Sequence, residues 1–357
     1  MNLLAPFTRH TQVKGEGCRQ SFELDMGYFY DILRLSELSR ADSDYGLQVE
    51  MQDCPYRFER IIRTGTEAHK QKTCAVIFRK EDTLYVTFRG TNVAKREHWL
   101  RNFNVQLDPL AEGYAHRGFH QTLFWPTHPE YDANSRPLLE VVQESLAALV
   151  SQHPECNKLV LSGHSAGGAM AQIYAVEYLE KPSAPSLKLD ALYTFASPRA
   201  LTTDLSERLK HYFKERGNLH CLRFVHPQDV VPQYPMKNTF FWGGKPLQYR
   251  HVGKPVLLLP NLDILAPESV TQYQKKHGVE AEFLDGTLTH VDSRVAPHHL
   301  DHYLEVIGAL AEREQGISHY WRDSVVPNHR RLLDLREKDE KNMWKLEAGK
   351  QSDPFLG

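Results

Sequence analysis

The spacing of apolar residues along the chain follows two periods, one typical of helices and one typical of strands. Between Phe22 and Ser39, and again between Pro137 and His153, apolar side chains recur every three or four residues and mark one face of an amphipathic helix. Two further helices are expected near 204–215 and over 300–313. Short runs rich in β-branched and aromatic residues predict strands at 74–78, 83–88, 159–161, 191–195 and 221–225.

From about residue 137 onward the predicted strands alternate with helices, which is typical of a mostly parallel sheet covered by helices on both faces. The sequence therefore predicts an α/β fold, with its principal domain over residues 71–315. Residues 1–70 are expected to form a helical extension packed on this core, and residues 316–357 a charged C-terminal extension. Residues 254–296, of mixed polarity with prolines and glycines in their flanks, predict a long excursion before the last helix.

The overall composition is that of an ordinary globular protein and changes this picture little. Hydrophobic residues make up 41% and charged residues 25% of the 357 residues. Because the formal net charge is −2, no overall field favours nucleic acid as a partner. The five cysteines are odd in number and lack the spacing of a zinc site, so reduced thiols are expected.

The N-terminal residues do not resemble a secretory signal, because no charged region is followed by a long apolar stretch. The most apolar run elsewhere, 256–259, is far shorter than the roughly 18 residues of a membrane-spanning helix. We therefore expect a cytoplasmic location, and export by a route that uses no N-terminal signal stays open. The sequence does not indicate an oligomeric state.

The strongest chemical signal is the pentapeptide at 163–167, which reads Gly-His-Ser-Ala-Gly. It directly follows a predicted strand and precedes a segment with helical character, the context of a nucleophile elbow. In such a turn the central serine, here Ser165, projects its hydroxyl from the edge of the sheet. The helix that follows presents unpaired N–H groups at the place where an oxyanion would form.

A serine nucleophile requires a histidine to accept its proton and an acid to orient that histidine. Asp229 follows the predicted strand at 221–225, and histidines at 298, 299 and 302 stand where a final loop turns into a helix. The order Ser, Asp, His is that of α/β-hydrolases. His298 and His302 have a spacing that could also bind a metal, but no Cys or second acidic ligand accompanies them, so no metal is expected.

These motifs together resemble the class 3 lipases, the fungal-type lipases of the α/β-hydrolase superfamily. The resemblance rests on five separated stretches, at 87–91, 116–119, 161–169, 194–199 and 229–232. It implies an α/β-hydrolase fold and a serine esterase mechanism on acyl-ester lipids, with catalytic roles for Ser165 and Asp229. Family members commonly place the catalytic histidine five residues before a tyrosine, which favours His298, because Tyr303 stands at that spacing. A less common spacing would select His299.

The resemblance also implies an oxyanion hole and a lid. Thr91 is expected to be one oxyanion donor, and the backbone N–H of Ala166 the other. Residues 92–103 mix apolar and basic side chains, and in this family the corresponding interval often forms a lid. The alternative is a fixed helix in which Trp99 belongs to the core.

We therefore expect a serine hydrolase that cleaves carboxylic esters of lipids through Ser165, Asp229 and His298, with no cofactor. Its partners would be a lipid ester substrate and, transiently, a membrane or lipid surface. One alternative is a phospholipase A1, including a toxic effector delivered without a signal peptide. Another is a non-catalytic scaffold that binds lipid or protein through the regions outside the motifs.

Overall fold

The structure is a computed structural model that describes residues 11–12, 23–40, 47, 51, 54–64, 72–90, 106–126, 135–217, 219–226, 229–235, 239–242, 245–258, 264–265 and 298–313. The segment 92–103, most of 254–296 and the extension 316–357 lie outside these ranges, so the expectations for them stay predictions. No helix within the described ranges is both long and apolar enough to cross a membrane.

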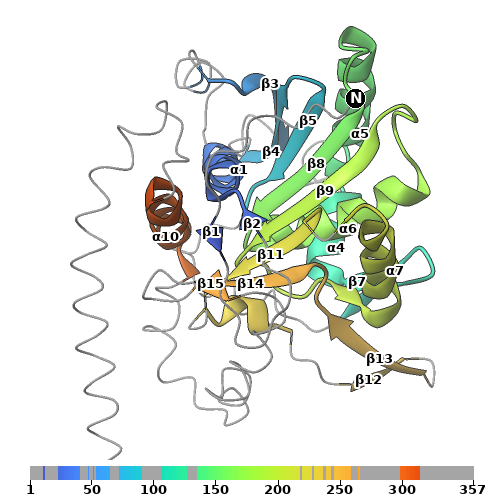
Figure 1. Ribbon diagram of the computed structural model, residues 1–357. Coiled ribbons are helices and arrows are strands. Elements are labelled where there is room, and N and C mark those ends of the chain that lie inside the picture. The colour runs from blue at the N-terminus through green and yellow to red at the C-terminus, as the bar shows by residue number, and fades with distance from the viewer. Residues whose placement is uncertain are drawn as a thin grey trace, which may run out of the picture.

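The larger sheet, within the described residues, has eight strands in the order β15, β14, β11, β9, β8, β5, β4, β3 (Figure 1). In chain order these are β3 (Arg57–Thr64), β4 (Lys72–Lys80), β5 (Thr83–Phe88), β8 (Lys158–His164), β9 (Lys188–Phe195), β11 (Cys221–Val225), β14 (Lys254–Leu258) and β15 (Ile264–Leu265). The five strands from β5 to β14 are mutually parallel, and the outer pairs at both ends are antiparallel. Since parallel sheets are stable only when both faces are buried, helices must cover each side.

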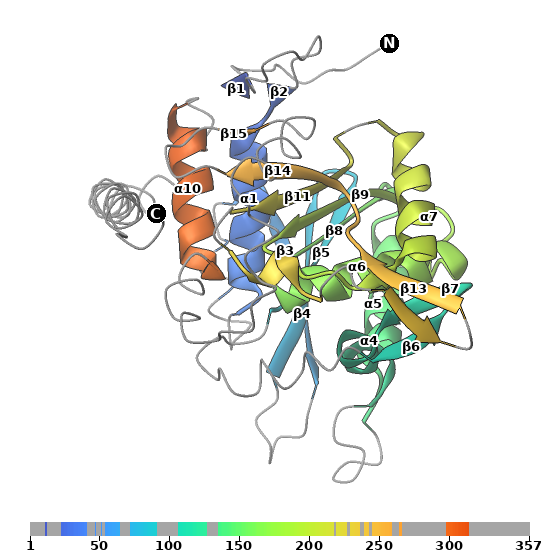
Figure 2. The same ribbon diagram turned by 90° about the horizontal axis from the view of Figure 1, so that it is seen from below.

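Helices do cover both faces of this sheet (Figure 2). One face carries α1 (Met26–Leu38) and α10 (Leu300–Arg313), which also pack against each other. The other face carries α4 (Arg117–Phe124), α5 (Leu138–Gln152), α6 (Ala166–Glu180) and α7 (Thr203–Lys214). The first and the last described helices therefore share one side of the molecule.

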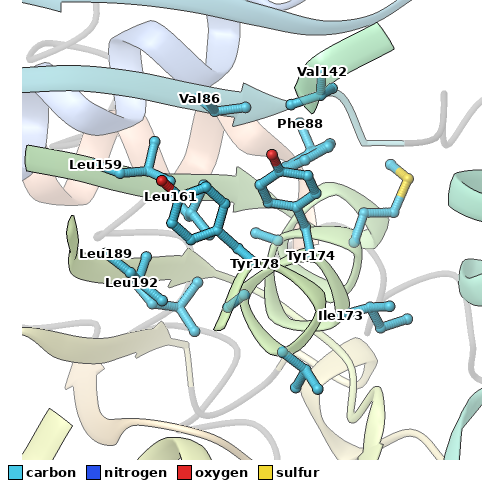
Figure 3. Close-up of a cluster of buried hydrophobic side chains, with 14 of the residues drawn as sticks. Val86, Phe88, Val142, Leu159, Leu161, Ile173, Tyr174, Tyr178, Leu189 and Leu192 are labelled. Carbon is cyan, nitrogen blue, oxygen red and sulfur yellow. The ribbon is translucent and has the colours of Figure 1, made fainter. Parts of the chain in front are cut away.

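The central strand β8 shows why the sheet has two hydrophobic layers. Successive side chains of a strand point to opposite faces, and here the three successive side chains at 159–161 are all apolar. Leu159 and Leu161 are buried in the layer that contains α6 (Figure 3). Val160, between them, is buried in the layer that contains α1 and α10. Helix α6 is buried around almost its whole circumference, which fixes the end of β8 and the turn that follows it.

A second, antiparallel sheet lies beside the first, with five described strands in the order β12, β13, β10, β7, β6. These are β6 (Leu107–Leu110), β7 (Gly113–His116), β10 (Leu201–Thr202), β12 (Thr239–Trp242) and β13 (Lys245–Arg250). The remaining short elements are the pair β1 (Thr11–Gln12) and β2 (Glu23–Leu24) and the 3₁₀ turn η2 (Val231–Gln233).

The predicted helices are confirmed as α1, α5, α7 and α10, and the strands predicted at 74–78 and 83–88 as the antiparallel pair β4 and β5. The strand β3 was not foreseen: it lies within the range 1–70, expected to be helical, and brings part of that range into the sheet itself. The parallel centre, the helices on both faces and the sharp turn from β8 into α6 together make this an α/β-hydrolase fold.

Candidate active site

The turn between β8 and α6 is a nucleophile elbow. Ser165 has φ 58° and ψ −129°, a conformation that is rare for a residue with a side chain and costs of order 1–3 kcal/mol. A Cβ added to Gly163 would lie 2.3 Å from the carbonyl carbon of Gly167, and one added to Gly167 would lie 2.1 Å from the carbonyl oxygen of Phe88. Glycine is required at both positions because the neighbouring backbone leaves no room for a side chain.

Backbone hydrogen bonds hold the elbow against the sheet and start the helix. The Ser165 N–H donates to the carbonyl of Phe195 on β9 at 2.9 Å, and the Ser165 carbonyl accepts from the Gly168 N–H at 3.0 Å. Ala166 is the first residue of α6, so its N–H belongs to the group for which a helix offers no internal acceptor. This is the position expected for an oxyanion donor.

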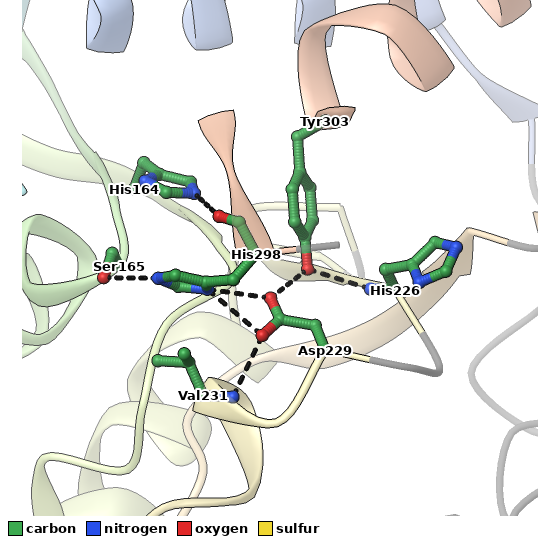
Figure 4. Close-up of polar contacts among 7 residues, drawn as sticks. All are labelled: His164, Ser165, His226, Asp229, Val231, His298 and Tyr303. Carbon is green, nitrogen blue, oxygen red and sulfur yellow. Dashed lines mark hydrogen bonds and ion pairs between the residues drawn. The ribbon is translucent and has the colours of Figure 1, made fainter. Parts of the chain in front are cut away.

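His298 lies two residues before α10 and faces the elbow (Figure 4). Its Nε2 is 2.8 Å from the Ser165 Oγ, and its Nδ1 is 3.1 Å and 3.0 Å from the two carboxylate oxygens of Asp229. A carboxylate accepts and does not donate, so Nδ1 carries the proton and Nε2 is free to accept the serine proton. The imidazole is therefore in the tautomer that a general base requires.

Asp229 accepts hydrogen bonds from other donors besides His298. Its Oδ1 accepts from the Val231 N–H at 2.9 Å, and its Oδ2 accepts from the Tyr303 hydroxyl at 2.8 Å. The same Tyr303 oxygen accepts from the N–H of His226 at 2.9 Å, which links α10 to the end of β11. Because the carboxylate is bonded on both oxygens, it has one orientation in the site (Figure 4).

The three residues of this arrangement are buried: Ser165 and Asp229 are each 1% exposed and His298 is 0% exposed. Charge that develops in such a place interacts more strongly than it would in water. The structure thus brings together a hydroxyl, an imidazole and a carboxylate in a hydrogen-bonded line, an arrangement that can activate a serine for attack on an acyl carbon.

The other histidines of the cluster are not in this line. His299 is exposed, and its carbonyl accepts from the His302 N–H at 3.0 Å at the start of α10. The His302 ring contacts the His226 ring, with centroids 4.7 Å apart. The alternative base His299 is therefore not brought to Ser165. Within the described ranges, no group of three or more His, Cys, Asp or Glu side chains could hold a metal ion.

The expected donor Thr91 lies outside the described residues. Its neighbour Gly90 is described and lies against the elbow, because a Cβ added there would be 2.6 Å from the His164 carbonyl oxygen and 3.4 Å from the Ser165 Cβ. Ala166 is described and buried at 8% exposure. One of the two expected oxyanion donors is thus located next to the serine, and the role of Thr91 stays a prediction.

Two side chains in the site had no role in the sequence interpretation. Tyr303 was noted only for its spacing from His298, and the structure adds its contact with Asp229. His164 was a variable position of the pentapeptide, yet its ring lies beside that of His298, with centroids 5.0 Å apart. The spacing of Tyr303 was a usable signal, whereas no local pattern could have revealed the contact of His164.

Known proteins match the part of the chain that carries Ser165 and Asp229, although the family match ends before His298. Residues 85–239 match the family described as lipase (class 3). The chain is 28% identical to a lipase of Rhizopus niveus over 163 residues, which is 45% of this chain and 37% of that protein. It is 31% identical to a triacylglycerol lipase of Nicotiana tabacum over 102 residues, which is 28% of this chain and 18% of that protein.

Solved structures include similar folds. The triacylglyceride lipase of Rhizomucor miehei superposes with a TM-score of 0.43 at 17% identity, over 64% of this chain and 78% of that one. The Lip2 lipase of Yarrowia lipolytica superposes with a TM-score of 0.46 at 15% identity, over 70% of this chain and 82% of that one. The sequence matches span well under half the length of the curated relatives named above.

Proposed function

We propose that this chain, of which residues 85–239 match the class 3 lipase family, is a serine hydrolase that cleaves the carboxylic esters of acylglycerols. The observation that carries the proposal is the buried line from the Ser165 Oγ through the His298 imidazole to the Asp229 carboxylate. The names of the relatives, which include a triacylglycerol lipase, support a lipid ester as the substrate.

In the proposed reaction, His298 Nε2 takes the proton of Ser165 as the Oγ attacks the ester carbonyl carbon. The carbonyl oxygen becomes an oxyanion, which the N–H of Ala166 and, as expected from the sequence, Thr91 would stabilise. The tetrahedral intermediate collapses, the ester C–O bond breaks, and the imidazolium gives its proton to the departing alcohol. Asp229 stabilises the imidazolium throughout.

The second half of the reaction releases the fatty acid. His298 accepts a proton from water, and the resulting hydroxide attacks the acyl carbon bonded to Ser165. A second tetrahedral intermediate forms at the same oxyanion donors. Its collapse breaks the bond to the Ser165 Oγ, which recovers its proton from the imidazolium, and the fatty acid leaves. Every proton is carried by His298, so no cofactor enters the proposed cycle.

The decisive test is covalent labelling of the serine. A fluorophosphonate probe should label the wild-type protein and fail to label Ser165→Ala, and hydrolysis of a short nitrophenyl ester should fall at least about 10⁴-fold in that variant. Ser151→Ala, at an exposed position of α5, is the matched control and should behave as wild type. A folded wild-type protein that takes no label would favour a non-catalytic scaffold.

A second assay addresses the class of lipid. The wild-type protein is incubated with emulsified triacylglycerol and, separately, with phosphatidylcholine vesicles, and the products are identified by mass spectrometry. Diacylglycerol and free fatty acid from the emulsion support the proposal. Release of lysophospholipid alone would replace it with phospholipase A1 activity, since the same three side chains serve either ester.

A further inference from the structure

The carbonyl oxygen of His298 lies outside the hydrogen-bond ladder of α10. The first acceptor of that ladder is the carbonyl of His299, which accepts from the N–H groups of His302 and Tyr303 at 3.0 Å and 3.4 Å. His298 itself is 0% exposed. A buried carbonyl that the helix does not use must find a donor elsewhere, because leaving it unpaired is costly.

The donor is the ring of His164, the residue directly before the serine. The His164 Nε2 is 2.9 Å from the His298 carbonyl oxygen, and the His164 side chain is 2% exposed (Figure 4). The two residues are 134 positions apart in the chain. The hydrogen bond therefore ties the end of β8 to the segment that enters α10.

The chemical state of His164 is fixed by its surroundings. A carbonyl oxygen only accepts, so Nε2 carries the hydrogen. Burial lowers the pKa of His164 well below its usual range, and the neighbouring His298 lowers it further, so the ring is neutral and Nδ1 carries no proton. Among the described residues Nδ1 has no hydrogen-bond partner. The ring thus makes a single directed hydrogen bond, to the backbone of His298.

The neighbouring rings restrict His164 further. Its centroid is 5.0 Å from that of His298 and 5.8 Å from that of Tyr303, the latter in an edge arrangement. His164 therefore contacts both the imidazole of the triad and the tyrosine that holds Asp229. His164 and Ser165 therefore each form a hydrogen bond with His298. The His164 ring bonds to the backbone carbonyl oxygen of His298, and the Ser165 hydroxyl bonds to its Nε2.

We propose that His164 is a positioning residue that holds the backbone of His298, so that one turn of the chain aligns both the nucleophile and the base. This inference rests on the proposed hydrolase function. The quantity at stake is the distance between His298 Nε2 and the Ser165 Oγ. Without the hydrogen bond from His164, the His298 backbone can shift relative to Ser165. A displacement of about 1 Å in such a geometry costs on the order of 100-fold in rate.

The test compares three variants that differ in whether a donor remains near the position of Nε2. His164→Gln keeps an amide N–H there, because the glutamine amide nitrogen reaches as far as Nε2 does. His164→Asn keeps the amide but is one bond too short, and His164→Leu keeps similar volume without any donor. For each, kcat and KM are measured on a short nitrophenyl ester, together with the melting temperature.

We expect kcat to fall about 10- to 100-fold in the Asn and Leu variants with KM within about 2-fold of wild type. The Gln variant should stay within about 3-fold of wild type in both constants. The split between kcat and KM, and the rescue by glutamine, are outcomes that a purely structural role would not give. If the Leu variant does not fold, the Asn variant still tests the loss of the hydrogen bond.

Two results would overturn the positioning role: wild-type kcat in all three variants, or an equal loss of kcat in all three, glutamine included. A wild-type protein that is folded but hydrolyses no ester would instead overturn the proposed function. The two failures are therefore distinguishable, because the first requires an active wild-type enzyme and the second an inactive one.

Discussion

The elbow that carries Ser165 and the helix start that carries His298 differ in what holds them in place. The elbow is fixed by backbone packed on backbone, because a Cβ added to Gly163 or to Gly167 would lie less than 2.5 Å from a backbone atom. The helix start is fixed by side chains from distant parts of the chain, namely Asp229, His164 and Ser165 itself. The proposed nucleophile is thus held by local contacts, and the proposed base by residues distant in the sequence.

This difference predicts two kinds of failure. A side chain added in the elbow has no space to enter, so it should damage the fold. A hydrogen bond removed near His298 leaves the sheet and its hydrophobic layers intact, so it should damage catalysis first. The following substitutions are chosen to separate the two outcomes.

The largest effect on activity is expected from Asp229→Asn. The asparagine can donate an N–H to His298 Nδ1 and so favour the tautomer in which Nε2 cannot accept the serine proton. We expect kcat to fall about 10⁴-fold with the melting temperature little changed. The matched control is His299→Ala, at an exposed position next to the base, which should retain wild-type kcat. Comparable losses in both variants would contradict the assignment of His298 as the base.

The largest effect on stability is expected from Gly167→Ala. The new Cβ would lie 2.1 Å from the carbonyl oxygen of Phe88, which is backbone and cannot rotate away. We expect the free energy of unfolding to fall by about 3 kcal/mol or more. In Gly308→Ala, on α10, the new Cβ would meet the ring of Tyr30, with the nearest carbon at 2.9 Å, and the substitution should cost less because a side chain can shift. Urea unfolding measures both, and equal losses would refute the contrast.

Tyr303→Phe is expected to have smaller effects, on both stability and activity. The substitution removes the hydroxyl that donates to Asp229 Oδ2 and leaves the buried His226 N–H without the acceptor it has in the structure. We expect the free energy of unfolding to fall by about 1–3 kcal/mol and kcat to fall about 10-fold. If kcat stays at the wild-type value while stability falls, Tyr303 supports the fold alone and plays no part in orienting the acid.

The smallest expected effect is the dependence of the free energy of unfolding on pH. Burial lowers the pKa of His116 on β7 from 6.5 to about 4 and that of His226, beside the acid, to about 3. Between pH 6.5 and pH 4 the unfolded chain therefore binds more protons than the folded one, so stability falls as the pH is lowered.

Urea unfolding between pH 7 and pH 4 measures this slope. His116→Phe removes one of the buried histidines whose pKa is lowered and should make the dependence of the unfolding free energy on pH shallower. An unchanged slope would mean that His116 does not contribute to acid sensitivity. A slope that vanishes entirely would mean that neither His226 nor His164 contributes to it.

Much of the fold was predictable because its signals are local. The elbow could be recognised from two glycines around Ser165 between a strand and a helix, and the bounds expected for α10 agree with those observed. The strand β3 was missed because it pairs on one side only and carries charged residues on its half-exposed surface. Arg60, for example, reaches across to the Ser145 hydroxyl on α5 at 3.2 Å. An edge strand of this kind has no clear apolar pattern.

The site could be predicted as far as the order of its residues along the chain is informative. Ser165 and Asp229 follow from motif and order, whereas His298 and His299 are adjacent and differ only in which one the tertiary structure buries. The contact of His164 could not be predicted, because its partner is 134 residues away and no periodicity links the two. Local sequence specifies the nucleophile, and long-range packing selects the base.

The packing of α10 against α1 has a consequence for synthesis. Helix α10 begins at Leu300 and completes the layer that α1 starts, so His298 reaches Ser165 only when the late part of the chain has docked on the early part. A nascent chain still attached to the ribosome with α10 in the exit tunnel would hold the nucleophile and the acid but not the base. In the proposed hydrolase of lipid esters, this order of assembly keeps Ser165 without its base until α10 has left the ribosome and docked on α1.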